Sequence, residues 1–231
     1  MSEEERGAKQ PILNAPSVVR WLLTITLGAH ILRMLSGDGM LIPQNIAGEI
    51  FFTLAFIPAR YLTQVDPSGD LLAAVISPVG HTLVHGNWIH LLTNLGFLLA
   101  FGTPVARRMG PVLFLIFYGL CAAAGAFLFA VFSPMQITPL VGASGAIFGL
   151  LGAIMRIALY PPEGAPPAPF PFNNRRTAFM FAGIYLVINL LMGFAPALFG
   201  VEGAVAWQAH LGGFAAGFLL MPFVDGRGRL R

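Results

Sequence analysis

One histidine stands inside a glycine-rich apolar run, residues 209–217, which reads Ala209-His210-Leu211-Gly212-Gly213-Phe214-Ala215-Ala216-Gly217. A second run of small residues opens another apolar segment and reads Gly142-Ala143-Ser144-Gly145-Ala146. Ionisable side chains within an apolar span are costly and usually have a function. A serine and a histidine that meet can act as a nucleophile and its base. The pattern therefore raises the question of whether the fold brings Ser144 and His210 together.

The composition indicates a membrane protein. Of the 231 residues, 56% are hydrophobic and 10% are charged, with a mean hydropathy of +0.76, whereas a soluble domain carries about 25% charged residues. Apolar stretches of roughly 17–25 residues recur, and lipid admits such segments as helices. The single cysteine, Cys121, excludes an intramolecular disulfide framework. The net charge of +3 does not indicate nucleic-acid binding, because the arginines are needed for membrane orientation.

The apolar segments predict an all-α membrane protein, a bundle of six transmembrane helices. The six expected spans are residues 17–36, 84–104, 111–132, 144–160, 177–198 and 205–224. Turn residues and charges separate them. We therefore expect one membrane domain over residues 17–224, with tails at 1–16 and 225–231. The charged start of the chain lacks a signal-peptide pattern, so we expect the first span to be retained.

Basic residues predict the orientation, because cytoplasmic loops of membrane proteins carry an excess of arginine and lysine. With the N-terminus inside, eleven basic residues face the cytoplasm and two, Arg33 and Arg60, face outward. Both termini are then cytoplasmic. Residues 45–62 are apolar enough to span, but a crossing there would break this charge bias. We therefore place them in the outer interface, as an amphipathic stretch of the first outer loop, 37–80.

Under this topology the second, fourth and sixth spans run in the same direction and carry polar residues at similar depth. Ser144, His210, His90 and Asn94 all fall within roughly 15 Å of the outer surface, at 1.5 Å per residue. His90 and Asn94 are four residues apart, so they project from one face of the second span. The sequence thus predicts that these four side chains gather in the outer part of the bundle.

Glycine spacing predicts a close contact between the fourth and sixth spans. Gly213 and Gly217 share a helix face with His210, and Gly145 and Gly149 repeat the same spacing. Small residues four apart let helix backbones approach closely in a membrane. Such an approach is what a hydrogen bond between His210 and Ser144 requires.

Simpler interpretations exist for each residue taken alone. The run around Ser144 could be a packing interface, and its hydroxyl could bond its own backbone. His210 could be a satisfied interior histidine, and Asn94 could hold helices together. His81 and His85 are four residues apart and could bind a metal, but they lack the glutamate of a His-Glu-x-x-His site and a third ligand. We expect no metal.

At these residues the chain resembles the rhomboid intramembrane serine proteases. Residues 142–145 match the family's Gly-x-Ser-Gly, and residues 209–217 match its last helix. The family's second helix, with spaced histidines ending in His-x-x-x-Asn, matches residues 81–94. Phe148 falls where the family places an aromatic ring against the base. The resemblance covers about residues 17–224, but the family's Trp-Arg pair is missing from residues 37–80, where Pro58-Ala59-Arg60-Tyr61 is nearest.

The resemblance implies a protease that cuts peptide bonds within or beside transmembrane segments of membrane-protein substrates, without a cofactor. Ser144 would be the nucleophile and His210 the base. The oxyanion would be met by the Ser144 N–H and by Asn94 and His90. No carboxylate stands at the right depth to orient His210, so we expect a dyad supported by Phe148. The supporting backbone is supplied by Gly142, Gly145 and Gly213.

By family analogy, the fifth span and the loop 195–204 would form the substrate gate and cap. Two rival functions are a catalytically silent rhomboid-like client binder and a small transporter. A silent relative typically lacks the serine or the histidine, and a transporter would carry polar residues at several depths. Twelve arginines to one lysine suggest a GC-rich bacterial genome, so we expect an integral protein of a bacterial inner membrane, in contact with the lipid bilayer and its membrane-protein substrates.

Overall fold

The computed structural model describes residues 14–37, 39–62, 70–161, 173–195 and 205–225, and these are helical with short connections. The described residues contain no β-strand, only two isolated bridges, of which one joins Phe56 to Leu140. The expected all-α fold is confirmed. Most of both predicted tails, 1–16 and 225–231, and most of the predicted cap, 195–204, lie outside the described residues.

Every predicted span coincides with a helix of the structure. The elements are α1 (Ser17–Met34), α2 (Gln44–Leu54), η2 (Pro58–Tyr61), α3 (Leu71–Gly80), η3 (His81–Leu83), α4 (Trp88–Phe97), η4 (Leu98–Gly102), α5 (Thr103–Met109), α6 (Pro111–Phe132), α7 (Ser144–Leu159), α8 (Arg175–Phe194) and α9 (Trp207–Val224). Among the described residues, three helices are both long and apolar enough to cross a membrane: Trp88–Met109, Pro111–Phe132 and Arg175–Phe194. The expected number of six spans therefore stays a prediction.

The second span begins later and ends later than predicted. It starts at Trp88 rather than at residue 84, because the Asn87 side chain caps α4 by accepting the His90 N–H at 2.9 Å. It then continues through η4, a π-helical turn, into α5. Pro104 has no N–H to donate to the turn before it, which explains why the helical ladder widens there.

The first outer loop contains more helix than predicted. Residues 45–62 form α2 and η2, and α2 buries none of its residues. Arg60 donates to the carbonyl oxygens of Phe52 and Ala55, at 2.7 and 3.0 Å, and thereby closes the C-terminal end of α2. The helix α3 was not predicted; it begins where the Asp70 side chain accepts the Ala73 N–H.

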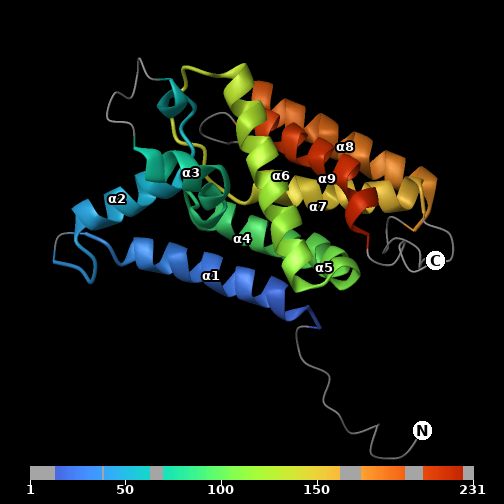
Figure 1. Cartoon of the computed structure of the whole chain (residues 1–231), viewed down its shortest axis with the longest axis horizontal. Helices are drawn as coiled ribbons and strands as arrows, with labels where there is room; N and C mark the ends of the chain where they lie inside the picture. Colours follow the sequence, from blue (N-terminus) through green and yellow to red (C-terminus); the bar gives the residue numbers. More distant parts are fainter. Residues whose placement is uncertain (1–13, 38, 63–69, 162–172, 196–204, 226–231) are drawn as a thin grey trace, which may run out of the picture.

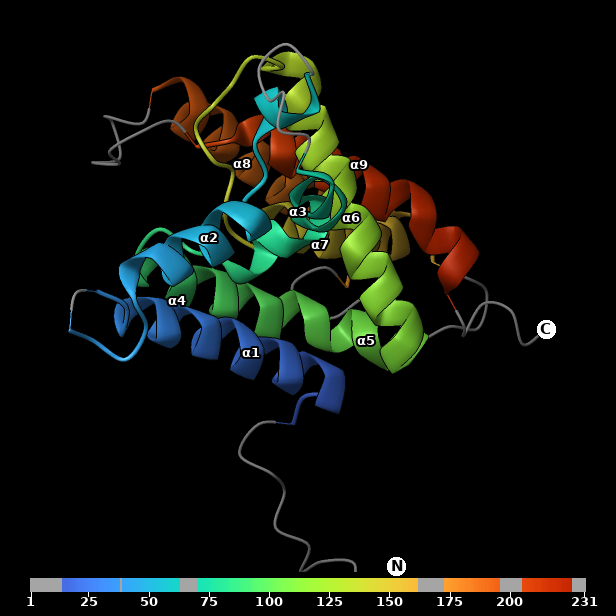
Figure 2. The same ribbon diagram turned by 60° about the vertical axis from the view of Figure 1, so that its left-hand side comes forward.

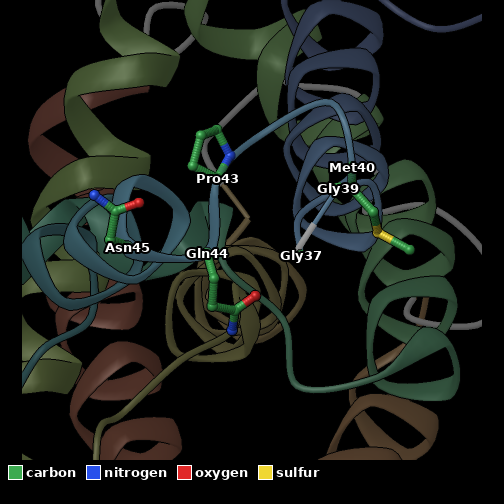
Figure 3. A pocket seen from close by; sticks show the side chains of 6 residues that line it. All are labelled: Gly37, Gly39, Met40, Pro43, Gln44 and Asn45. Carbon is green, nitrogen blue, oxygen red and sulfur yellow. The ribbon is translucent and has the colours of Figure 1, made fainter.

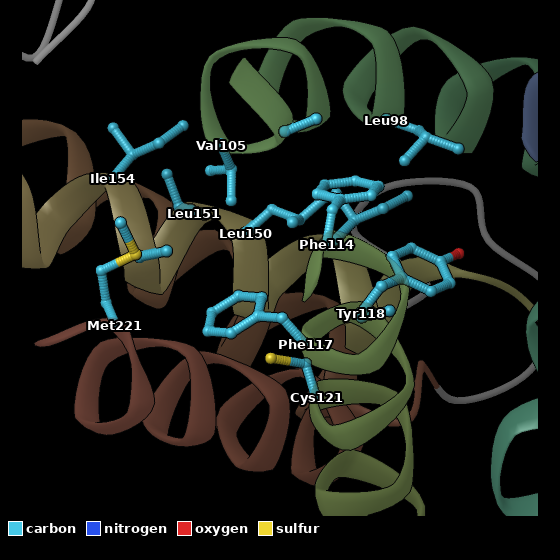
Figure 4. Close-up of a cluster of buried hydrophobic side chains, with 14 of the residues drawn as sticks. Leu98, Val105, Phe114, Phe117, Tyr118, Cys121, Leu150, Leu151, Ile154 and Met221 are labelled. Carbon is cyan, nitrogen blue, oxygen red and sulfur yellow. The ribbon is translucent and has the colours of Figure 1, made fainter. Parts of the chain in front are cut away.

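Helix α7 lies at the centre of the helical bundle (Figure 1). Helix α9 packs closely on α7 and α6, and α8 lies beside α7 and α9. On the other side, α1 runs along α4 and α5 in both views (Figure 2). Side chains of α6 and α7 dominate the buried apolar cluster in Figure 4, among them Phe114, Phe117 and Leu150.

The contact between α7 and α9 is made of glycine against backbone. A Cβ atom built on Gly213 would overlap the carbonyl oxygen of Gly145, and one built on Gly217 would overlap that of Gly149. Larger side chains at these two positions of α9 would therefore force the helices apart. Because the two helices touch through their backbones, short side chains at their ends can reach one another.

A buried ion pair ties α9 to the end of the second span. Arg108 and Asp225 approach to 3.1 Å, and their side chains are 6% and 5% exposed. A different feature of the surface is a pocket between α1 and α2 (Figure 3), lined by Gly37, Gly39, Met40, Pro43, Gln44 and Asn45. These lining residues all belong to the first outer loop, so this pocket is separate from Ser144 and His210.

Candidate active site

Ser144 is the first residue of α7, and the turn before it needs a glycine. Gly142 has φ of +110°, a left-handed conformation that residues with a Cβ rarely adopt. A Cβ atom at Gly142 would also lie 2.6 Å from Nε2 of His90. No side chain caps the start of α7, and the first N–H groups of a helix have no partner within the helix itself.

The segment that precedes α4 holds this turn in place. The Gly142 N–H donates to the carbonyl oxygen of His81 at 2.9 Å, and the Ala143 N–H donates to Nε2 of His85 at 3.4 Å. The His85 carbonyl oxygen in turn accepts from the Arg33 guanidinium at 2.6 Å. His81 and His85 thus position the backbone next to the serine, which no spacing argument had indicated.

His210 lies one turn into α9 and reaches the serine directly. Its Nε2 is 2.7 Å from the Ser144 Oγ, and the residue is 8% exposed. The Phe148 ring stacks on the imidazole, with the ring centroids 4.2 Å apart and the planes at 8°. A nucleophile within hydrogen-bond distance of a base is the geometry that hydroxyl activation requires.

The other ring nitrogen of His210 also has a partner. Nδ1 forms a short hydrogen bond with Oδ1 of Asn189, a residue of α8 that is 4% exposed. The sequence predicted no partner for Nδ1, because no carboxylate stands at the depth of His210. The signal was an asparagine amid the apolar residues of α8, since a polar group in a membrane span needs a hydrogen-bonding partner.

His90 and Asn94 lie close to the turn that carries Ser144, and their observed contacts are local. The His90 ring packs against His85, with centroids 5.1 Å apart, and its Nε2 faces Gly142. The Asn94 side chain is buried, and its Nδ2 donates to the His90 carbonyl oxygen at 2.8 Å. In this structure the Asn94 amide therefore forms its hydrogen bond within α4.

Comparison with known proteins decides the family. Residues 73–226, more than half of the chain, match the family model described as Rhomboid domain. The chain belongs to the rhomboid family. This confirms the resemblance carried by residues 81–94, 142–145 and 209–217, which all fall within the matched region. Together with the apolar helices, it makes the chain an integral membrane protein.

Three rhomboid relatives illustrate the similarity. RHOMBOID-like protein 5 of Arabidopsis thaliana is 31% identical over 137 residues, covering 59% of this chain and 40% of its own length. Rhomboid protease GluP of Bacillus subtilis (strain 168) is 34% identical over 195 residues, covering 74% of this chain and 34% of its own. For Rhomboid protease GlpG of Haemophilus influenzae the identity is 29% over 152 residues, covering 64% and 69%.

The chain therefore spans two-fifths or less of the length of several curated rhomboid relatives that it matches. Two of the three relatives described above carry the word protease in their names.

Proposed function

We propose that this rhomboid is an intramembrane serine endopeptidase, which hydrolyses peptide bonds within or next to the transmembrane segments of membrane proteins. The observation that carries the proposal is the 2.7 Å distance between His210 Nε2 and Ser144 Oγ. Both groups are held by rigid elements: the serine by the turn at Gly142 and the histidine by the glycine contact of α9 with α7. The names of bacterial relatives point the same way.

The proposed reaction has two stages, acylation of Ser144 and hydrolysis of the acyl-enzyme. The Ser144 Oγ attacks the scissile carbonyl carbon while Nε2 of His210 takes the hydroxyl proton, and that proton then passes to the leaving amine. An acyl-enzyme remains on Ser144. A water molecule, deprotonated by the same Nε2, next attacks the ester, releases the new carboxyl group and restores the serine hydroxyl.

The oxyanion hole in this proposal combines backbone and side-chain donors. The N–H groups at the start of α7 stand at the positive end of a helix dipole, where negative charge is stabilised. His90 borders the same turn. One N–H of the Asn94 amide donates to the His90 carbonyl oxygen, and the second N–H is the one proposed to donate to the oxyanion. Loss of one such donor costs about 10²–10³ in kcat.

The proposed membrane arrangement keeps six spans, formed by α1, α4 to α5, α6, α7, α8 and α9, with both termini in the cytoplasm of a bacterial cell. In this arrangement α2 and η2 lie in the outer interface. The apolar α3 is a short helix of the same outer region. The reaction requires no cofactor and no metal in this mechanism, and its partners are membrane-protein substrates and the bilayer.

A direct experiment labels the purified protein in detergent with a fluorophosphonate probe and incubates it with a generic transmembrane substrate. Wild type is expected to be labelled and to cleave; Ser144→Ala is expected to do neither, and His210→Ala should lose cleavage while it stays folded. Equal labelling of wild type and Ser144→Ala would refute the nucleophile. Binding of the substrate with no cleavage by wild type would favour the silent client binder.

A further inference from the structure

We propose that Asn189 is a positioning residue that selects the tautomer of His210. The inference rests on the proposed protease function and adds a third residue to the expected pair. The proposed nucleophile and base lie on α7 and α9, whereas Asn189 lies on α8.

The orientation of this amide follows from its second contact. Asn189 Nδ2 lies 3.4 Å from the carbonyl oxygen of Trp207, and a carbonyl oxygen can only accept. The NH₂ group must therefore face Trp207, and Oδ1 must face His210. A reversed amide would set two acceptors against each other at Trp207. The backbone of α9 thus fixes which end of the amide meets the imidazole.

The amide orientation then determines the tautomer of the base. Oδ1 can only accept, so the hydrogen on the imidazole of His210 must be on Nδ1. Nε2 is left with a free lone pair, and it faces the Ser144 hydroxyl at 2.7 Å. The opposite tautomer would present an N–H to the serine and could not take its proton. Asn189 therefore fixes the tautomer of His210, which is one of the two tasks of the carboxylate in a Ser-His-Asp triad.

Helix α8 supports the imidazole on a second side as well. One turn before Asn189, the Tyr185 ring packs against Phe148 with centroids 4.8 Å apart, and Phe148 stacks on His210. Elsewhere α8 is largely exposed: Ala178 and Asn189 are its buried residues. The tautomer of the base therefore depends on a helix with a small buried surface, and a displacement of α8 would take Asn189 away from His210 and Tyr185 away from Phe148.

The test compares Asn189→Leu, which has similar shape but no acceptor, with Asn189→Asp, which restores one. We expect Asn189→Leu to lower kcat about 10- to 100-fold, as happens when the outer hydrogen-bonding partner of a metal-bound histidine is removed, and to leave KM unchanged. Asn189→Asp should recover most of kcat. The matched control is Val187→Ala, an exposed position on the same helix, which should behave like wild type.

A second readout does not depend on activity. In protein labelled with ¹⁵N-histidine, the His210 signals, assigned by comparison with His210→Gln, should show a protonated Nδ1 and an unprotonated Nε2. In Asn189→Leu they should shift towards the other tautomer. Unchanged signals and a wild-type kcat in Asn189→Leu would overturn the proposal. A wild-type protein that neither cleaves substrate nor reacts with the fluorophosphonate probe would refute the protease function. The ¹⁵N signals of His210 would still show whether Asn189 fixes its tautomer.

Discussion

Gly213 of α9 lies against the backbone carbonyl of Gly145, which follows the proposed nucleophile directly in the chain. The distance between Ser144 and His210 is therefore set by a contact between two backbones, where there is no side chain that could move aside. This relationship makes the two residues sensitive to a single methyl group placed outside the site.

We expect Gly213→Ala to lower kcat by about 100-fold, because the added Cβ overlaps the Gly145 carbonyl oxygen and a misplacement of about 1 Å can cost that much. The control is Gly96→Ala on α4, where a Cβ meets nothing within 4 Å. Kinetics and thermal unfolding in one detergent measure both variants. A Gly213→Ala protein with wild-type kcat would show that the helices can separate without harm.

Alanine variants at Gly142 and Gly110 distinguish the cost of backbone strain from a loss of activity caused by a contact in the site. Both have positive φ, +110° and +77°, so an alanine at either should lower the free energy of unfolding by about 1–3 kcal/mol. At Gly142 the new Cβ also meets His90, whereas at Gly110 it meets nothing within 4 Å. We therefore expect only Gly142→Ala to lose activity. Equal kcat in the two variants would contradict this account.

The stacking of Phe148 on His210 predicts a moderate, shape-dependent effect. Aromatic pairs of this kind contribute about 0.5–1.5 kcal/mol beyond their burial, so Phe148→Leu should lower kcat by roughly 2- to 10-fold. Phe148→Tyr keeps the ring and should retain activity. The measurement is kcat at saturating substrate, and full activity in Phe148→Leu would leave the orientation of the base to Asn189 alone.

The buried pair Arg108–Asp225 predicts a large effect on stability. Asp225→Asn leaves the Arg108 charge without its carboxylate, which typically costs about 3–5 kcal/mol. Glu49→Gln on α2 removes an exposed carboxylate and should change stability by less than about 0.5 kcal/mol. Thermal unfolding in detergent compares them. Equal melting temperatures would mean that the pair contributes nothing to the fold.

The proposed topology predicts a cytoplasmic C-terminus. Fusion of green fluorescent protein after Arg231 should fluoresce, and fusion of alkaline phosphatase at the same place should be inactive, because each reporter works on one side of the membrane. The reverse result would refute both the six spans and the orientation. It would also remove the argument that Ser144, His210 and His90 share a depth near the outer surface.

The sequence predicted the parts of the site that depend on helix geometry. Residues four apart on a helix share a face, so the approach of α9 to α7 at Gly213 and Gly217 could be expected before any coordinates, and with it the meeting of Ser144 and His210. The positions of the long apolar helices followed from composition in the same way. The glycine spacing is a periodic pattern and the apolar helices are a compositional one, and both are visible in the sequence of a single chain.

The features that were missed depend on contacts between distant segments. Nothing local shows that Asn189 faces His210, because that meeting depends on how α8 packs beside α9. The hydrogen bond from Ala143 to His85 likewise joins residues 58 positions apart. The start of α4 was missed for a different reason: the capping residue Asn87 lies inside the segment 84–104 that was assigned to the span.

The length of α7 has a consequence for the surrounding lipid. Its 16 residues measure about 24 Å, against roughly 30 Å for the hydrocarbon core of a bilayer. Arg156, in the last turn, lies over the Tyr160 ring, a pairing suited to the headgroup region. If α7 spans the bilayer as proposed and that end is fixed there, Ser144 lies about 6 Å short of the opposite interface. Hydrophobic mismatch would then thin the lipid around Ser144, and the acyl-chain length of the lipids should change how easily water reaches the serine.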